Sequence, residues 1–133
     1  MEEIVDQLRE SSLSCASYLE LPTEDELVLI EEEILLPIPR EMRSFLLQVS
    51  DVIYGSLEPV TVADPGAHTH LSEVTSVAWS NGVSRELIVL CQQGDSYFCV
   101  TQEGEVKLWQ AGQLTEQTWE SVWDWAESVW LNS

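Results

Sequence analysis

Two histidines one residue apart are the best candidates for metal chemistry in this sequence. His68 and His70 are followed by Glu73, and zinc accepts imidazole nitrogens and carboxylates as ligands. A zinc site needs three or four ligands held together, and Glu73 is only a speculative third. We therefore interpret the pair as part of a surface loop that leads into a helix, and we expect no metal and no other cofactor.

A hydrolytic site is a second possibility, because Asp64 and His68 have the residue types of a catalytic dyad that would act on Ser72. Nucleophilic serines of this kind sit at a sharp turn between a strand and a helix, within a glycine-containing motif. The sequence around Ser72 has neither feature. We therefore predict that the chain is not an enzyme.

Charge is the strongest feature of the sequence. The 133 residues include 24 acidic and 5 basic side chains, for a net charge of -19. No Lys or Arg occurs between Glu10 and Pro39, or after Leu108. Proteins that bind nucleic acids need a cationic face, so nucleic acids and anionic membranes are excluded as partners. A basic protein partner is favoured, although surplus acid could also serve solubility alone.

Eight residues are predicted to contact such a partner, as outward carboxylates or as an exposed ring. They are Glu24, Asp25, Glu31, Glu32, Asp51, Glu58, Asp64 and Trp125. The first four lie in a helical stretch that must turn its apolar residues inward. The next three lie in predicted loops, where binding residues often occur. Trp125 is about 200° from Trp123 around a regular helix, and exposed tryptophans are enriched in interface hot spots.

Length and composition indicate one domain in a reducing compartment. Apolar residues make up 44% of the chain and charged residues 22%, as in ordinary globular domains. The sequence has no run of 18 apolar residues, and its acidic N-terminus is unlike a secretory signal. The 3 cysteines form no CxxC pair, which argues against a disulfide framework. We therefore expect a cytoplasmic protein.

The spacing of apolar residues predicts three helices before residue 50. Their inner faces consist of Ile4, Val5, Leu8 and Cys15; of Leu27, Ile30 and Ile34; and of Ile38, Met42, Phe45, Leu46 and Val49. The first should end near Pro22. Thr23 and Glu26 form a capping box before the second, and Pro39 suits the first turn of the third.

The second half predicts strands and two further helices. A short strand lies within 57–62, a helix capped by Thr69 or Ser72 covers 71–78 and ends at Asn81-Gly82, and a meander comprises 86–91, 96–101 and 105–109. With a two-residue first turn, Cys91 pairs with Phe98 and Leu90 with Cys99, so the cysteines face opposite sides. The last helix should have Trp119, Val122, Trp123, Ala126 and Trp130 on its inner face. The expected fold is α+β: an antiparallel sheet of at least three to four strands against N-terminal helices, with a Trp-rich C-terminal helix.

Three segments resemble the SUKH superfamily. Residues 36–47, which read LPIPREMRSFLL, are similar to its "LP, then a helix ending in FL" segment. Residues 90–106 contain LC, GDSYF and EGEV, similar to its second signature, and WESVW at 119–123 is similar to its C-terminal helix. The resemblance covers about 27–130. Residues 49–55 lack the Asn-Gly-Gly element that members often carry there, so no role of that loop is carried over.

The resemblance implies a single binding domain, residues 1–133, without catalytic residues. The superfamily includes yeast cell-wall-synthesis regulators and bacterial immunity proteins, which neutralise toxins, often nucleases. Our first hypothesis is a monomeric bacterial immunity protein whose acidic surface covers a toxin's basic cleft. Alternatives are a dimeric, acidic type III secretion chaperone, a housekeeping regulator of the same fold, and a metal-dependent enzyme that uses His68 and His70.

Overall fold

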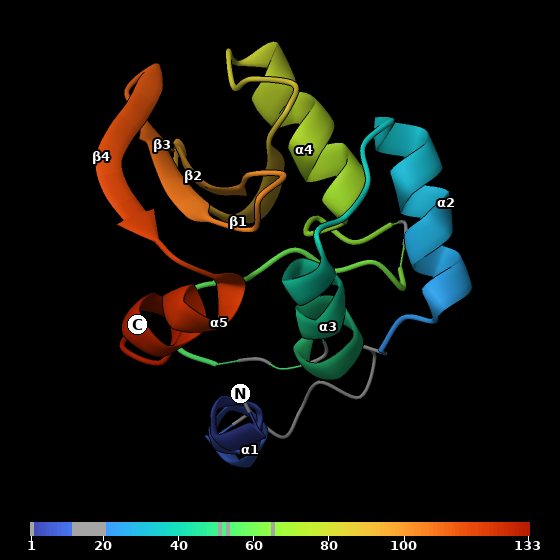
Figure 1. Cartoon of the computed structure of the whole chain (residues 1–133), viewed down its shortest axis with the longest axis vertical. Helices are drawn as coiled ribbons and strands as arrows, with labels where there is room; N and C mark the ends of the chain where they lie inside the picture. The colour runs from blue at the N-terminus through green and yellow to red at the C-terminus, as the bar shows by residue number, and fades with distance from the viewer. Residues whose placement is uncertain (1, 12–20, 51, 53, 65) are drawn as a thin grey trace.

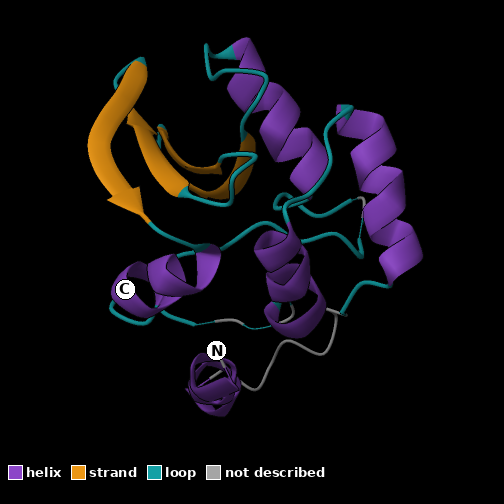
Figure 2. Cartoon of the chain, in the orientation of Figure 1, coloured by secondary structure: helices purple, strands orange, loops and turns teal. Residues whose placement is uncertain are grey.

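The computed structural model describes residues 2–11, 21–50, 52, 54–64 and 66–133 (Figure 1). Its elements are α1 (Glu2–Ser11), α2 (Glu24–Ile34), α3 (Arg40–Val49), α4 (Leu71–Ser80), β1 (Ile88–Gln93), β2 (Ser96–Val100), β3 (Val106–Gln110), β4 (Gln113–Trp119), α5 (Val122–Trp125) and a π-helical turn, Ala126–Trp130. The strands form a four-stranded antiparallel sheet in the order β1-β2-β3-β4 (Figure 2). The predicted α+β class is confirmed.

The helices are arranged around one end of the curved sheet. Helix α4 packs on β1, and α2 packs on α4, so that α2 and β4 lie at opposite sides of the molecule (Figure 1). Helix α3 packs against both α1 and α5. None of the helices in the described ranges is long and apolar enough to cross a membrane.

Helices α2 and α3 follow the sequence closely, whereas α1 is described only to Ser11, so the predicted end of the first helix near Pro22 is not tested. Thr23 and Glu26 form the predicted capping box, and the three apolar residues predicted for the inner face of α2 are buried. The predicted inner face of α3 is buried as well, and the helix begins directly after Pro39. In α1, Ile4 and Leu8 are buried, whereas Cys15 lies outside the described residues.

Helix α4 has the predicted position but not the predicted cap. Its N-cap is His70, whose side chain makes no capping bond. The hydroxyls of Thr69 and Ser72 have other partners: Thr69 bonds to Thr61 at 2.8 Å, and Ser72 donates to Glu33 at 3.0 Å. Asn81 caps the other end, as predicted. The strand expected within 57–62 is reduced to isolated bridges at residues 57, 59 and 61.

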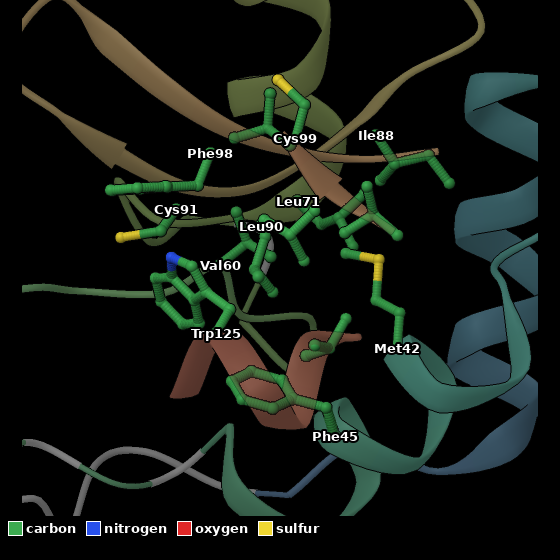
Figure 3. Close-up of a cluster of buried hydrophobic side chains, with 14 of the residues drawn as sticks. Met42, Phe45, Val60, Leu71, Ile88, Leu90, Cys91, Phe98, Cys99 and Trp125 are labelled. Atoms are coloured by element: carbon green, nitrogen blue, oxygen red, sulfur yellow. The ribbon is translucent and has the colours of Figure 1, made fainter. Parts of the chain in front are cut away.

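A bulge changes one predicted strand pair. Cys91 pairs with Phe98 as expected, but Cys99 pairs with Val89, because the register shifts between Val89 and Cys91. The extra residue, Leu90, is fully buried and its carbonyl accepts a 2.8 Å bond from the Val60 amide. Cys91 and Cys99 are free thiols that point to opposite sides of the sheet (Figure 3).

The predicted last helix includes Trp119, but in the structure this residue belongs to a strand, β4. Its residues are mostly exposed, so the apolar alternation that marks a strand is missing. Ala111 and Gly112 have φ of 56° and 86°, which suits the two-residue hairpin turn between β3 and β4. Trp119 therefore ends β4 opposite Val106. The helix starts only at Val122, after the Ser121 cap.

Trp125 was predicted to be exposed, and this is wrong: its side chain is 0% exposed. The prediction assumed that only one side of the helix is covered, but Trp123 and Trp125, both within α5, are each buried. A π-helical turn follows α5 directly. The Leu131 amide donates to the Ala126 carbonyl at 2.9 Å, which is a five-residue step. This wider turn places Trp125 and Trp130, five residues apart, on the same side, with stacked rings 6.3 Å apart.

Phe45 is the centre of the aromatic core. Its ring lies 5.6 Å from Trp123, 6.4 Å from Trp125 and 5.6 Å from Trp130. Trp125 in turn lies 5.4 Å from Phe98 of β2 (Figure 3). The cluster thus joins α3, the sheet and the C-terminal helix.

The C-terminus is tied to the loop after α3. The Tyr54 hydroxyl donates to the Leu131 carbonyl at 2.7 Å, and the Trp130 indole donates to the Tyr54 carbonyl at 3.1 Å. Gly55 has φ +59°, and a Cβ at this position would overlap Ser133. Glycine is required here by both conformation and space.

We expect Trp123→Ala and Trp125→Ala each to lower the free energy of unfolding by about 3–5 kcal/mol, because each leaves a cavity.

Phenylalanine substitutions test the hydrogen bonds of the indole N–H groups. The indole N–H groups of Trp123 and Trp125 are buried without a partner in the described structure, whereas that of Trp130 is bonded. Trp130→Phe should therefore cost about 1 kcal/mol more than Trp125→Phe. Urea titration measures both, and the opposite order would contradict these hydrogen-bond assignments.

Gly55→Ala should destabilise the protein more than Gly94→Ala. Both glycines have nearly the same φ, +59° and +60°. The left-handed backbone conformation therefore costs alanine the same free energy at either position, about 1–2 kcal/mol. Only Gly55 is packed, since nothing lies within 4 Å of a Cβ at Gly94. The excess cost, expected to be about 1 kcal/mol or more, measures the packing of the C-terminus. Equal costs in urea titrations would show that Ser133 moves away freely.

Candidate functional site

A cleft of about 490 Å³ lies beside the loop that follows α3. Its lining combines apolar and polar side chains, among them Val49, Ser50, Val52, Leu57, Glu58, Thr61, Asp64, His68, Thr69 and Trp130. Backbone bonds hold its walls: the Val60 amide donates to Leu90 of β1, and the Thr61 amide donates to the Thr69 carbonyl, both at 2.8 Å. The cleft is thus lined by the end of α3, by the loop between α3 and α4, and by Trp130.

Two of the predicted loop carboxylates meet at this cleft. Glu58 bonds to Nε2 of His68 at 2.5 Å, with both side chains more than half exposed. Asp64 accepts a 2.9 Å bond from the Gly66 amide and is otherwise open to solvent. Asp51, the third loop candidate, lies outside the described residues. The structure therefore keeps Glu58 and Asp64 as accessible acids on one rim.

The suggested catalytic and metal sets do not assemble in the described structure. His68 pairs with Glu58, while Ser72 donates to Glu33 of α2. His70 is buried at 6% exposure, whereas His68 is exposed. Among the residues the structure describes, no three His, Cys, Asp or Glu side chains are grouped to hold a metal ion.

The buried thiols are poorly suited to nucleophilic chemistry. Burial away from water raises the pKa of Cys91 and of Cys99 from 9.0 to about 12. For Cys91, a hydrogen bond with the Glu58 backbone lowers the pKa by less than burial raises it, and the nearby Glu58 charge raises it by a still smaller amount. Both thiols therefore stay protonated at neutral pH.

The acids of α2 fall into two groups. Glu24, Asp25 and Glu32 are exposed, as predicted for partner contacts. Glu31 is different: its carboxylate accepts a 2.7 Å bond from the Ile38 amide and another of 2.7 Å from the Arg43 guanidinium. These bonds brace the link between α2 and α3, so we remove Glu31 from the contact candidates. Trp125 is removed as well, because it is buried.

Sequence reasoning missed two apolar residues on α2. Val28 is 45% exposed and Leu29 is 58% exposed. Together with Asp25 and Glu32 they form the outer α2 face, opposite the buried stripe of that helix. The signal in the sequence is the spacing i, i+3, i+4 and i+7 of these four residues, which places them on one face of a helix.

Comparison with known proteins identifies the family of the chain and agrees with its overall fold. The family model SUKH_5, described as SMI1-KNR4 cell-wall, matches residues 1–131. A crystal structure of a protein from Pseudomonas syringae pv. tomato is similar over 100% of both chains, with 56% sequence identity and a TM-score of 0.97. A search of curated proteins gave no match. The resemblance read from the sequence is confirmed, and the chain belongs to the SUKH family of SMI1-KNR4 cell-wall domains.

Proposed function

We propose that this chain is a protein-binding module for a basic partner, and specifically an immunity protein that neutralises a toxin by covering its basic active-site cleft. Family membership supports the binding role, since the SUKH superfamily includes toxin-immunity proteins. It also favours this hypothesis over the secretion chaperone. The mechanism is steric, so the chain needs no catalytic residue of its own.

The carrying observation is the concentration of uncompensated carboxylates on α2. Glu24, Asp25, Glu32 and Glu33 are exposed, and the sequence has no basic residue between Glu10 and Pro39. Arg43 does bond to this helix, but its partner is Glu31, which lies beside the apolar stripe and not on the outer face. The outer charges therefore create a negative field that attracts a basic protein and speeds its encounter.

Basic side chains elsewhere do little to weaken this field. The chain has 5 Lys and Arg side chains against 24 acidic ones. With a net charge of -19, most carboxylates lack a cation within the chain. A basic toxin cleft would supply these missing cations.

Growth rescue tests the immunity role. We expect that co-expression of this chain restores growth to cells that produce the C-terminal domain of the polypeptide encoded beside it. The two purified proteins should then form a 1:1 complex, measured by light scattering. Absence of both rescue and complex would contradict the proposal and favour a regulatory role for the same fold. A stable dimer of this chain alone would instead favour the chaperone.

Salt dependence tests the electrostatic mechanism with the same toxin domain. The triple variant Glu24→Gln, Asp25→Asn, Glu32→Gln should slow association by at least about threefold at low salt. The difference should vanish near 1 M salt, where the screening length is about 3 Å. Stopped-flow mixing measures the rates.

A matched control removes three other exposed acids, Glu103→Gln, Glu116→Gln and Glu127→Gln, and so changes the net charge equally. It should slow association less, because these residues lie away from α2. Glu58→Gln with Asp64→Asn tests the cleft rim in parallel. Rates that ignore salt and all of these substitutions would mean that the acids serve solubility only.

A further inference from the structure

The outer α2 face has an order of side chains that solubility alone does not explain. Along one side of the helix come Asp25, then Val28 and Leu29, then Glu32. The opposite side supplies the core through Leu27 and two isoleucines, so the fold does not use Val28 or Leu29. Two adjacent exposed apolar side chains are thus bracketed by carboxylates at each end.

A groove adjoins this face on the side of Leu29. It has a volume of about 460 Å³ and lies between α2 and the segment that leads into α4. Its lining is Glu26, Leu29, Ile30, Glu32, Glu33 and Val62, with the buried His70 at the base. The lining combines apolar side chains with three carboxylates, of which Glu26 also accepts from Thr23 and Glu33 from Ser72. This combination suits a Lys or Arg side chain, whose stem lies on apolar atoms while its charged head reaches the acids.

We propose that the outer α2 face docks a basic amphipathic helix of the partner, which places apolar side chains on Val28 and Leu29 and a Lys or Arg near each of Asp25 and Glu32. This inference rests on the proposed function and deepens it. It names the surface and the chemistry of the partner element that the surface recognises.

The spacing of charges selects a helix over a strand. From Asp25 to Glu32 the helix advances about 10.5 Å at 1.5 Å per residue. A partner helix with basic residues seven positions apart spans the same length, with apolar residues at i+3 and i+4 between them. On one face of a strand, side chains repeat about every 6.6 Å. One repeat is shorter than the distance from Asp25 to Glu32 and two repeats are longer, so a strand does not place basic residues opposite both acids.

Charge complementarity selects the partner class. A second copy of this chain would bring the same carboxylates against Asp25 and Glu32, at a net charge of -19 per chain. Like charges at close range oppose such a dimer. Nucleic acids and anionic lipids are repelled for the same reason, which leaves a basic protein segment.

A defined peptide tests the docking surface without knowledge of the natural partner. The probe repeats the heptad Lys-Ala-Ala-Leu-Leu-Ala-Ala three times and ends in Lys, and a scrambled peptide of equal composition is its control. We expect the full chain to bind the probe, with NMR shifts at the methyl groups of Val28 and Leu29. The double variant Val28→Gln, Leu29→Gln should weaken binding at least about tenfold, whereas Val77→Gln on α4, 49% exposed in the native chain, should not.

A charge swap gives the sharpest result. Asp25→Lys with Glu32→Lys should abolish binding of the lysine probe, because like charges then face each other at both ends of the outer α2 face. Urea titration confirms that each variant folds. Equal binding of the scrambled probe, or shifts centred on Glu58 and Asp64, would overturn the proposal. So would a dimer of the chain that Leu29→Gln dissociates, since the occupant would then be a second copy.

The same variants separate this inference from the proposed function. If the toxin domain binds the wild-type chain in a salt-dependent manner and binds Val28→Gln, Leu29→Gln equally well, then the outer α2 face is not the interface and the immunity role stands. If the toxin domain does not bind the wild-type chain, the proposed function itself fails.

Discussion

The packing of tryptophan rings around Phe45 is the interaction on which the rest of this structure depends. Phe45 comes from α3, Trp123, Trp125 and Trp130 come from the C-terminal helix, and Trp125 also contacts Phe98 of the sheet. Aromatic rings bury large areas and prefer tilted contacts, so the cluster both stabilises the fold and sets the angle between its parts.

This core leaves the acidic side chains free for another task. Because α2 is attached through its apolar stripe and through Glu31, its outer carboxylates make no described contact that the fold requires. The loop that borders the cleft is held separately, by the bonds between Tyr54 and the C-terminus. The molecule therefore presents two acidic surfaces on independently supported elements, the outer α2 face and the rim with Glu58 and Asp64. A fold of this kind can change its binding residues without loss of its core.

The site was predictable only in part. Glu24, Asp25 and Glu32 could be placed on the surface, because a helix with one apolar stripe must turn its carboxylates to water. Glu31 occurs in the same acidic run, and its spacing from Leu27 and Ile34 places it beside the apolar stripe, but the helix alone does not show what it binds. Its role depends on Arg43 and on the Ile38 amide, which reach it only when α3 packs beside α2.

Local interactions explain what the sequence by itself determined. The capping box of α2, the inner faces of α2 and α3, and the turn between β1 and β2 all depend on residues within a few positions of one another. Tertiary structure alone decided three other features: the bulge at Leu90, the polar strand β4, and the burial of Trp125. The bulge and the buried tryptophan satisfy distant partners, namely the Val60 amide and the rings of Phe45 and Phe98. Strand β4 pairs with the neighbouring β3, but its mostly exposed, polar residues lack the apolar alternation that predicts a strand. A helical wheel contains no such partner, so it cannot show that rings from α3 and from the sheet cover Trp125.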